Sequence, residues 1–171
     1  MKLATKINSY NVYKGGRKVI GVSDEVTLPD FEALTDTLSG PGMLGEFDEA
    51  LLGHFGASEM EIPFKTLDDP MFEMMGDGAA VDLTLRISTQ AMETSNLSTD
   101  FLPSRIVVRG KNKGFTGGSV KSGQGTGSSV KVEIAYILIE VNGKSKFELD
   151  KFNFIYKVNG KDLLEKLRRQ V

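Results

Sequence analysis

The chain lacks cysteine and tryptophan, and it has one histidine, His54, among 171 residues. Without cysteine there is no disulfide framework, no thiolate zinc site and no cysteine nucleophile. A lone histidine in a glycine-rich turn, with no serine in a nucleophile elbow, gives no support to a hydrolytic site. An enzyme is therefore the least expected class of protein, and we expect neither a cofactor nor a metal ion.

Long hydrophobic runs are also missing. No stretch reaches the roughly 18 consecutive apolar residues that indicate a membrane span, and residues 1–19 contain no apolar run like that of a signal peptide. The hydrophobic fraction of 40% and the charged fraction of 26% are ordinary for a globular protein. We expect a single domain over residues 1–171, with no membrane insertion.

Positive charge is missing from one part of the chain. Residues 19–64 contain ten aspartates and glutamates and no lysine or arginine, although the net charge of the chain is only −2. The excess of bases therefore lies outside this segment. Such segregation indicates surfaces with different partners, and a solvated acidic surface is the alternative.

Apolar and polar side chains alternate with a period of two along most of the chain, as in half-buried strands. The pair Asn142-Gly143 predicts a two-residue hairpin, and Asn159-Gly160 is expected to break the last strand. The fold is therefore expected to be mainly β. The predicted strands cover residues 19–28, 43–53, 58–65, 80–88, 104–110, 130–141 and 152–158.

The first three of these strands combine an apolar face with an acidic one. An ordinary sheet facing water mixes lysine with glutamate across strands, because like charges on neighbouring strands repel. These strands have no lysine or arginine to mix before Lys65, so their acidic face is expected to have an unusual role. The acidic side chains are Glu25, Glu46, Asp48, Glu59 and Glu61.

Two long loops and two helices complete the prediction. Residues 29–42 are polar and interrupted by glycine and proline, and residues 111–129 are rich in glycine, serine and lysine. Both are expected to be long loops, the second a hairpin tip that orders against a partner. In "LDDPMFEMMGDG" Asp69 is expected to cap a helix, with Pro70 in its first turn and Gly76 at its end. Its methionines and Phe72 are expected to pack in the core.

The chain closes with a short basic helix. Asp162 stands three residues before Glu165, which is a capping-box spacing. Leu163, Leu164, Leu167 and Val171 form an apolar stripe, and so short a helix needs something to dock on.

These segments together resemble the major tail tube protein of contractile-tailed phages and of phage-tail-like bacteriocins. The resemblance rests on "VTLPDFEALTDTLSGPGMLGEFD", on "HFG" before an acidic alternating strand, on "IVVRGKNKGFTGG" and above all on "ELDKFNFIYKVNGKDLLEKLRRQV". It covers nearly the whole chain. The glycine- and serine-rich segment 110–130 departs from the family's usual pattern.

The resemblance implies two antiparallel sheets packed as a sandwich or barrel, with one flanking helix and a short C-terminal helix. It implies six copies per ring and rings stacked into a tube inside a contractile sheath, which carries DNA or, in a bacteriocin, ions. Its partners would be further copies of itself, the tail sheath, baseplate and tail terminator proteins, the tape measure protein inside the lumen, and passing DNA without specific binding. The protein would be assembled in the bacterial host cytoplasm and reside in a virion or bacteriocin tail.

Residues for these contacts follow as expectations. The acidic side chains Glu25, Glu46, Asp48, Glu59 and Glu61 are candidates for the lumen, because a wall without lysine or arginine does not grip phosphate. The two loops supply candidate contacts to a neighbouring subunit or ring, namely Asp30, Phe31, Leu34, Leu38, Lys113, Phe115 and Lys121. The C-terminal docking candidates are Leu163, Leu167, Arg168 and Arg169.

Two other functions stay open on the sequence. A type VI-like secretion tube has the same physical requirements. A small-molecule carrier built as a closed β-barrel would instead be a monomer with an apolar cavity, which the acidic faces disfavour.

Overall fold

The computed structural model describes residues 1–23, 25–76 and 78–171, so Asp24 in the first predicted strand and Asp77 after the predicted helix lie outside the described residues. The described chain is mainly antiparallel β-structure with two short helices, as the sequence predicted. Its elements are β1 (Lys2–Lys14), β2 (Arg17–Lys18), β3 (Ala33–Leu38), β4 (Phe47–Phe55), β5 (Glu59–Phe64), α1 (Asp69–Met75), β6 (Val81–Glu93), β7 (Thr99–Thr116), β8 (Ser128–Val141), β9 (Lys144–Asp150), β10 (Ile155–Val158), β11 (Lys161–Asp162) and α2 (Glu165–Arg168).

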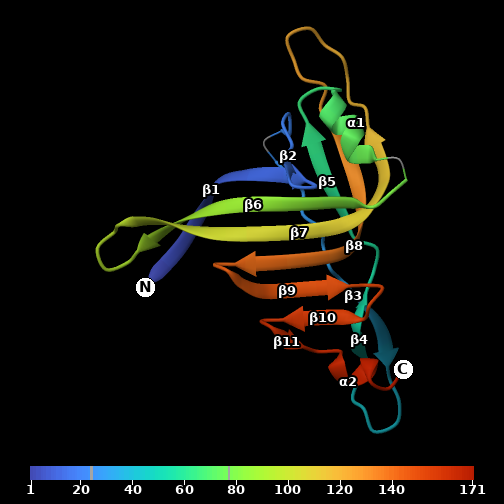
Figure 1. Ribbon diagram of the computed structural model, residues 1–171. Coiled ribbons are helices and arrows are strands. Elements are labelled where there is room, and N and C mark those ends of the chain that lie inside the picture. The colour runs from blue at the N-terminus through green and yellow to red at the C-terminus, as the bar shows by residue number, and fades with distance from the viewer. Residues whose placement is uncertain (24, 77) are drawn as a thin grey trace.

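One large sheet carries most of the chain (Figure 1). Its strands follow the order β11-β10-β9-β8-β7-β6-β1-β2, and β5 pairs with β8 off this path. The order is open, with β2 at one end and β11 at the other, so the sheet is not the closed barrel that the carrier alternative requires. A separate two-stranded sheet, β3-β4, lies at the β11 end (Figure 1).

The long strands β7 and β8 belong to two layers. Up to Arg109, β7 pairs with residues 136–141 of β8, and beyond a register shift it pairs with residues 129–134. Residues 128–133 of β8 also pair with β5. The backbones meet closely at this bend, where a Cβ on Gly110 would stand 2.0 Å from the Glu133 carbonyl oxygen. Glycine at position 110 therefore permits the bend that folds the second layer over the first.

The core lies between these layers. Met60 and Ile62 of β5 are fully buried in one cluster with Leu83 of β6 and Val108 of β7. This cluster is the sandwich core that the alternation predicted for residues 58–65, 80–88 and 104–110.

Helix α1 closes one end of the core. Met71 and Met74 are buried there, whereas Phe72 is exposed and stacks edge-on against Phe115 of β7. The predicted core position of Phe72 is therefore wrong. The predicted cap is wrong by one residue, because Asp68 has extended backbone and its carboxylate accepts from the Asp69 amide.

Several predicted boundaries are also wrong. Of the predicted strand 19–28, the described residues form isolated bridges to β5 at Val22 and Thr27. The expected loop 29–42 contains β3, because a partner strand, β4, is available to it. The expected loop 111–129 shortens to residues 117–127, because cross-strand pairing with β8 extends β7 to Thr116.

The C-terminal third turns more often than the sequence indicated. Asn142-Gly143 forms the predicted hairpin, with φ of 52° and 74°, and Asn159-Gly160 joins β10 to β11 where a simple break was expected. The predicted strand 152–158 is interrupted by a turn, because the Asp150 carboxylate accepts from the amides of residues 152 and 153. β10 begins after this turn.

Helix α2 has only four residues and no side-chain cap. Asp162 lies two residues before the Ncap Leu164 and accepts from its amide, so the predicted capping box does not form. The same carboxylate pairs with Arg168 at the other end of the helix.

Candidate assembly surfaces

The β3–β4 hairpin, hereafter the arm, projects from the body and is exposed along almost its whole length (Figure 1). Leu38 pairs with Phe47 and Asp36 pairs with Glu49, so these four side chains lie on one face together with Leu34. Leu34 is 51% exposed and Phe47 59%. An isolated two-stranded hairpin is marginally stable in water, so an arm with this much exposed apolar surface requires a covering partner.

The opposite face of the arm carries Thr37 and Asp48. Thr37 pairs with Asp48 and donates a hydrogen bond to its carboxylate at 2.7 Å. Glu46 lies just before β4, two residues from Asp48, and is exposed. Both predicted lumen acids of this region are therefore solvent-accessible on the arm.

The base of the arm is fixed by aromatic packing. The Phe31 ring contacts Phe55 at 6.0 Å and Phe147 at 5.3 Å between centroids, and Tyr156 completes the cluster. Phe31 was expected to contact another subunit, but the structure packs it inside its own. Asp30 beside it is exposed, as are Leu34 and Leu38.

The C-terminal segment docks on the same base. Leu164 is 4% exposed, and a Cβ on Gly53, whose φ is 79°, would stand 2.6 Å from its Cδ1 atom. A side chain at position 53 would displace Leu164, so glycine is required for this contact. Leu164 therefore anchors the C-terminal segment to β4 of its own subunit.

The predicted C-terminal docking residues differ in how far their side chains are already bonded within the subunit. Arg168 donates to the Phe154 carbonyl at 2.7 Å and pairs with Asp162, while Arg169 pairs with Glu165. The hydrogen bond from Arg168 lowers the pKa of the Asp162 carboxyl below its usual range. Arg168 therefore stabilises its own subunit. Leu163 is half-buried and Leu167 is 37% exposed.

The five predicted lumen acids do not form one surface within a subunit. Glu25 lies beside β1 and lines a pocket of about 380 Å³, Glu46 and Asp48 lie on the arm, and Glu59 and Glu61 lie on β5. On β5 the acids do not form a purely acidic face, because lysines lie next to Glu59.

The acids of β5 have lysine neighbours from strands that are distant in the sequence. Glu59 pairs with Lys113 of β7 at 3.2 Å and with Lys131 of β8 at 4.0 Å. Glu61 accepts from the Ser129 hydroxyl at 2.6 Å. Sequence reasoning missed these bases because the pairing of β5 with β8 brings together residues some 70 positions apart.

The remaining loop candidates lie near the β7–β8 hairpin. Lys113 and Phe115 belong to β7, where Lys113 pairs with Glu59 and Glu133, and Phe115 packs against Phe72. Lys121 lies in the loop 117–127 and is exposed. This loop is tied to the body by a hydrogen bond from the Thr126 amide to the Lys65 carbonyl at 2.9 Å.

The outer face of the large sheet carries paired charges that the sequence did not single out. Arg109 pairs with Asp82 and Arg105 pairs with Glu140, both at 2.7 Å. The Tyr136 hydroxyl donates to Glu148 at 3.2 Å, and burial together with that carboxylate raises the pKa of Tyr136 to about 12. Cross-strand register alone brings these pairs together.

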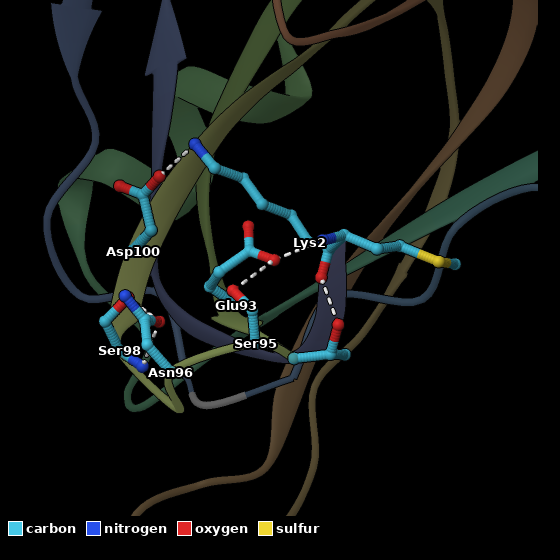
Figure 2. A network of polar contacts seen from close by, with 8 residues as sticks. Lys2, Glu93, Ser95, Asn96, Ser98 and Asp100 are labelled. Carbon is cyan, nitrogen blue, oxygen red and sulfur yellow. Dashed lines mark hydrogen bonds and ion pairs between the residues drawn. The ribbon is translucent and has the colours of Figure 1, made fainter.

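The β6–β7 hairpin extends beyond the core together with the start of β1 (Figure 1). Figure 2 shows the polar network at its tip, where Lys2 reaches Asp100, Glu93 meets the start of the chain, and Ser98 donates to Asn96. The network joins the first strand to the hairpin and holds this projection together.

A second set of bases stands at the opposite end of the sheet from the arm. Arg17 and Lys18 of β2 are exposed, and Ile20 beside them is 74% exposed. A groove of about 540 Å³ follows this edge between residues 8–12 of β1 and residues 18–23. The run "RKVI" was the signal in the sequence that could have identified it.

Within residues 1–23, 25–76 and 78–171, no group of three or more histidine, aspartate or glutamate side chains could hold a metal ion. Neither helix of the described chain has the length and apolarity to cross a membrane.

Comparison with known proteins agrees with this picture of an assembling subunit. The family model described as phage tail tube protein FII matches residues 4–171. The tail tube protein of Escherichia phage P2 is 29% identical over 172 residues, covering 100% of this chain and 99% of that protein. The major tail tube protein of Serratia phage KSP20 is 27% identical over 164 residues, covering 95% and 92% respectively. The resemblance inferred from the sequence is thereby confirmed, and the chain belongs to the phage tail tube protein FII family of structural tail proteins.

Proposed function

We propose that this tail tube subunit forms rings of six copies, and that the rings stack into a hollow tube through which DNA or ions pass. Its role is structural and not catalytic. The observation that carries the proposal is the arm, whose Leu34, Leu38 and Phe47 side chains are exposed in a single subunit.

The total surface supports assembly. The subunit exposes 11315 Å², whereas a compact monomer of 18.7 kDa exposes about 8,300 Å² by the usual scaling. The excess of roughly 3,000 Å² is several times larger than the roughly 800 Å² that each partner buries in a standard interface. One subunit therefore has enough extra surface for lateral neighbours and for neighbours in the next ring.

The strand spacing gives the width of the channel that such a ring would enclose. If each subunit contributes about four strands, roughly 24 strands spaced about 4.8 Å apart make a wall about 115 Å around. The channel is then roughly 37 Å wide between backbones, and strand tilt widens it.

The exposed acids Glu46 and Asp48 are the best remaining candidates for the lumen, because the described chain places no cation within ion-pair distance of either. Glu59 is a weaker candidate because it pairs with Lys113, and Glu61 is engaged by the Ser129 hydroxyl, whereas Glu25 stays a candidate on a separate surface beside β1. An acidic wall lets DNA slide, because cationic contacts provide most of the non-specific affinity for phosphate.

The other partners follow from the same role. The outside of the tube would meet the tail sheath, its ends the baseplate and tail terminator proteins, and its lumen the tape measure protein. The subunit would be made in the bacterial host cytoplasm and reside in the tail.

Electron microscopy of the purified protein over a range of concentrations tests the proposal. We expect rings or tubes of uniform width, and a reconstruction with six copies per ring in which Glu46 and Asp48 point into the channel. Folded monomers at every concentration, with or without a baseplate to start polymerisation, would refute it. A reconstruction in which both acids point away from the channel would refute the lumen assignment alone.

A further inference from the structure

We propose that Phe72 of one copy inserts its ring into the pocket that Leu52, Phe154 and Leu167 line in a second copy. This contact rests on the proposed function, and it names two of the surfaces through which the copies would meet.

The pocket lies at the base of the arm, between the end of β4, the turn that follows Asp150 and helix α2. Its volume is about 160 Å³. Leu164 lines it as a buried side chain, whereas Leu52, Phe154 and Leu167 are exposed. An apolar cavity of roughly 150 Å³ holds a benzene ring, so this pocket has room for one phenyl group.

Phe72 is an exposed aromatic side chain on a fixed element. It is 50% exposed, although one side of its ring stacks edge-on against Phe115. Helix α1, which carries it, is anchored in the core by the buried Met71 and Met74. A side chain presented from a fixed position loses little conformational freedom on binding, and aromatic anchors in partner pockets dominate many interfaces.

Acids without ion-pair partners flank Phe72. Asp69 lies three residues before it and therefore shares its side of the helix, and Glu73 follows it directly. Residues 66–76 contain no lysine or arginine, and no ion pair reaches either carboxylate from the described part of the chain. Lys14 does reach the helix, but it donates to the backbone carbonyl of Glu73.

The segment around the pocket is basic. Residues 151–171 contain six bases and only two acids. Both acids are already paired within the subunit, Asp162 with Arg168 and Glu165 with Arg169. An excess of positive charge therefore remains for a partner.

Two lysines place this charge at the pocket. Lys151 lines it and Lys166 directly precedes Leu167, and among the described residues neither lysine meets a carboxylate within ion-pair distance. Asp150 also lines the pocket, but its carboxylate accepts from the amides of residues 152 and 153. The two lysines match the two acids beside Phe72 in number and in opposite sign, and such complementarity steers association and fixes its register.

Other strongly exposed apolar side chains match the pocket less well. Ile20 lies two residues after Lys18, and Val120 directly precedes Lys121. Either would bring a base toward a basic pocket, which costs affinity. Phe72 brings acids instead.

The two surfaces lie at opposite ends of the subunit. Figure 1 shows α1 near the upper end and α2, which borders the pocket, at the lower end. A subunit therefore cannot fill its own pocket with its own Phe72. The contact joins two different surfaces head-to-tail, so it passes from copy to copy.

Truncating the ring tests the insertion. Phe72→Ala keeps Met71 and Met74, so α1 should stay in place. The concentration needed for half-assembly, followed by sedimentation and electron microscopy, should rise at least about tenfold. Phe101→Ala is the matched control, because Phe101 is exposed to a similar extent on β7, and it should stay within about twofold of the wild type.

Charge reversal identifies the partner as a second copy. One variant carries Asp69→Lys with Glu73→Lys, and the other carries Lys151→Glu with Lys166→Glu. Each variant alone sets like charges against each other and should assemble about tenfold less readily. In an equimolar mixture each reversed helix can meet a reversed pocket and each native helix a native pocket, so assembly should return.

Three results separate this inference from the proposed function. The inference is overturned if Phe72→Ala assembles like the wild type. It is also overturned if the mixture stays disassembled while circular dichroism shows both variants folded. A folded wild type that never assembles would instead refute the proposed function.

Discussion

One added methyl group at Gly110 tests the bend that creates the two-layered fold. In Gly110→Ala the new Cβ would lie 2.0 Å from the Glu133 carbonyl oxygen and 2.9 Å from its carbonyl carbon, and real Cβ atoms essentially never approach below 3.0 Å. The Glu133 backbone must therefore move by roughly 1 Å. It cannot move freely, because it is paired with Lys111 of β7 on one side and with Glu59 of β5 on the other.

The cost can be estimated from these contacts. Two or three distorted backbone hydrogen bonds cost about 1 kcal/mol each, and overpacking a filled site adds about 1–3 kcal/mol. We expect a loss of about 3–5 kcal/mol of unfolding free energy, a large part of the roughly 5–15 kcal/mol of a typical domain.

Urea denaturation below the concentration at which light scattering detects assembly measures this loss. Gly117→Ala on the same hairpin is the control, because its Cβ would have no neighbour within 4 Å, and its stability should change by no more than about 0.5 kcal/mol. If Gly110→Ala stays within about 1 kcal/mol of the wild type, the close approach of the two backbones is not what shapes this bend.

Two further predictions concern the arm base and the outer face of the sheet. Leu164→Ala should lower the free energy of unfolding by about 2 kcal/mol, the low end for a buried leucine, because Leu164 packs against Gly53 at the periphery of the fold. Val171→Ala is the control, because the Val171 side chain is 87% exposed and its loss should not change the stability measurably in urea denaturation. Equal losses in both variants would refute the docking of the C-terminal segment. Folding raises the pKa of Tyr136 from 10.0 to about 12, so its neutral phenol contributes stability that is fully present below pH 10 and declines as the pH rises toward 12. An ultraviolet titration should therefore find a phenol that ionises near pH 12, and Tyr136→Phe should remove that step; titration curves that coincide for the wild type and Tyr136→Phe near pH 12 would contradict the burial of its hydroxyl.

The sequence by itself determined the class of the fold and the family. The period-two alternation in residues 58–65 and 80–88 could be read from the sequence, because it reflects which face of its own strand each side chain occupies. The Asn142-Gly143 hairpin and the helix around Pro70 were equally readable, because turn and helix-start preferences act over a few neighbouring residues.

Only the tertiary structure decided which residues meet. Pairing of β5 and β7 with β8 brought Lys131 and Lys113 to Glu59, which stands in a stretch of sequence without any base. Pairing also turned residues 33–38 from an expected loop into a strand, since a strand is defined by a partner and not by its own composition. Arg168 was taken for an external contact, yet the turn at Phe154 and the hairpin at Asn159-Gly160 fold it back onto Asp162. Local sequence records propensity and burial, while cross-strand register joins residues far apart in the chain, and that register exists only once the whole sheet has formed.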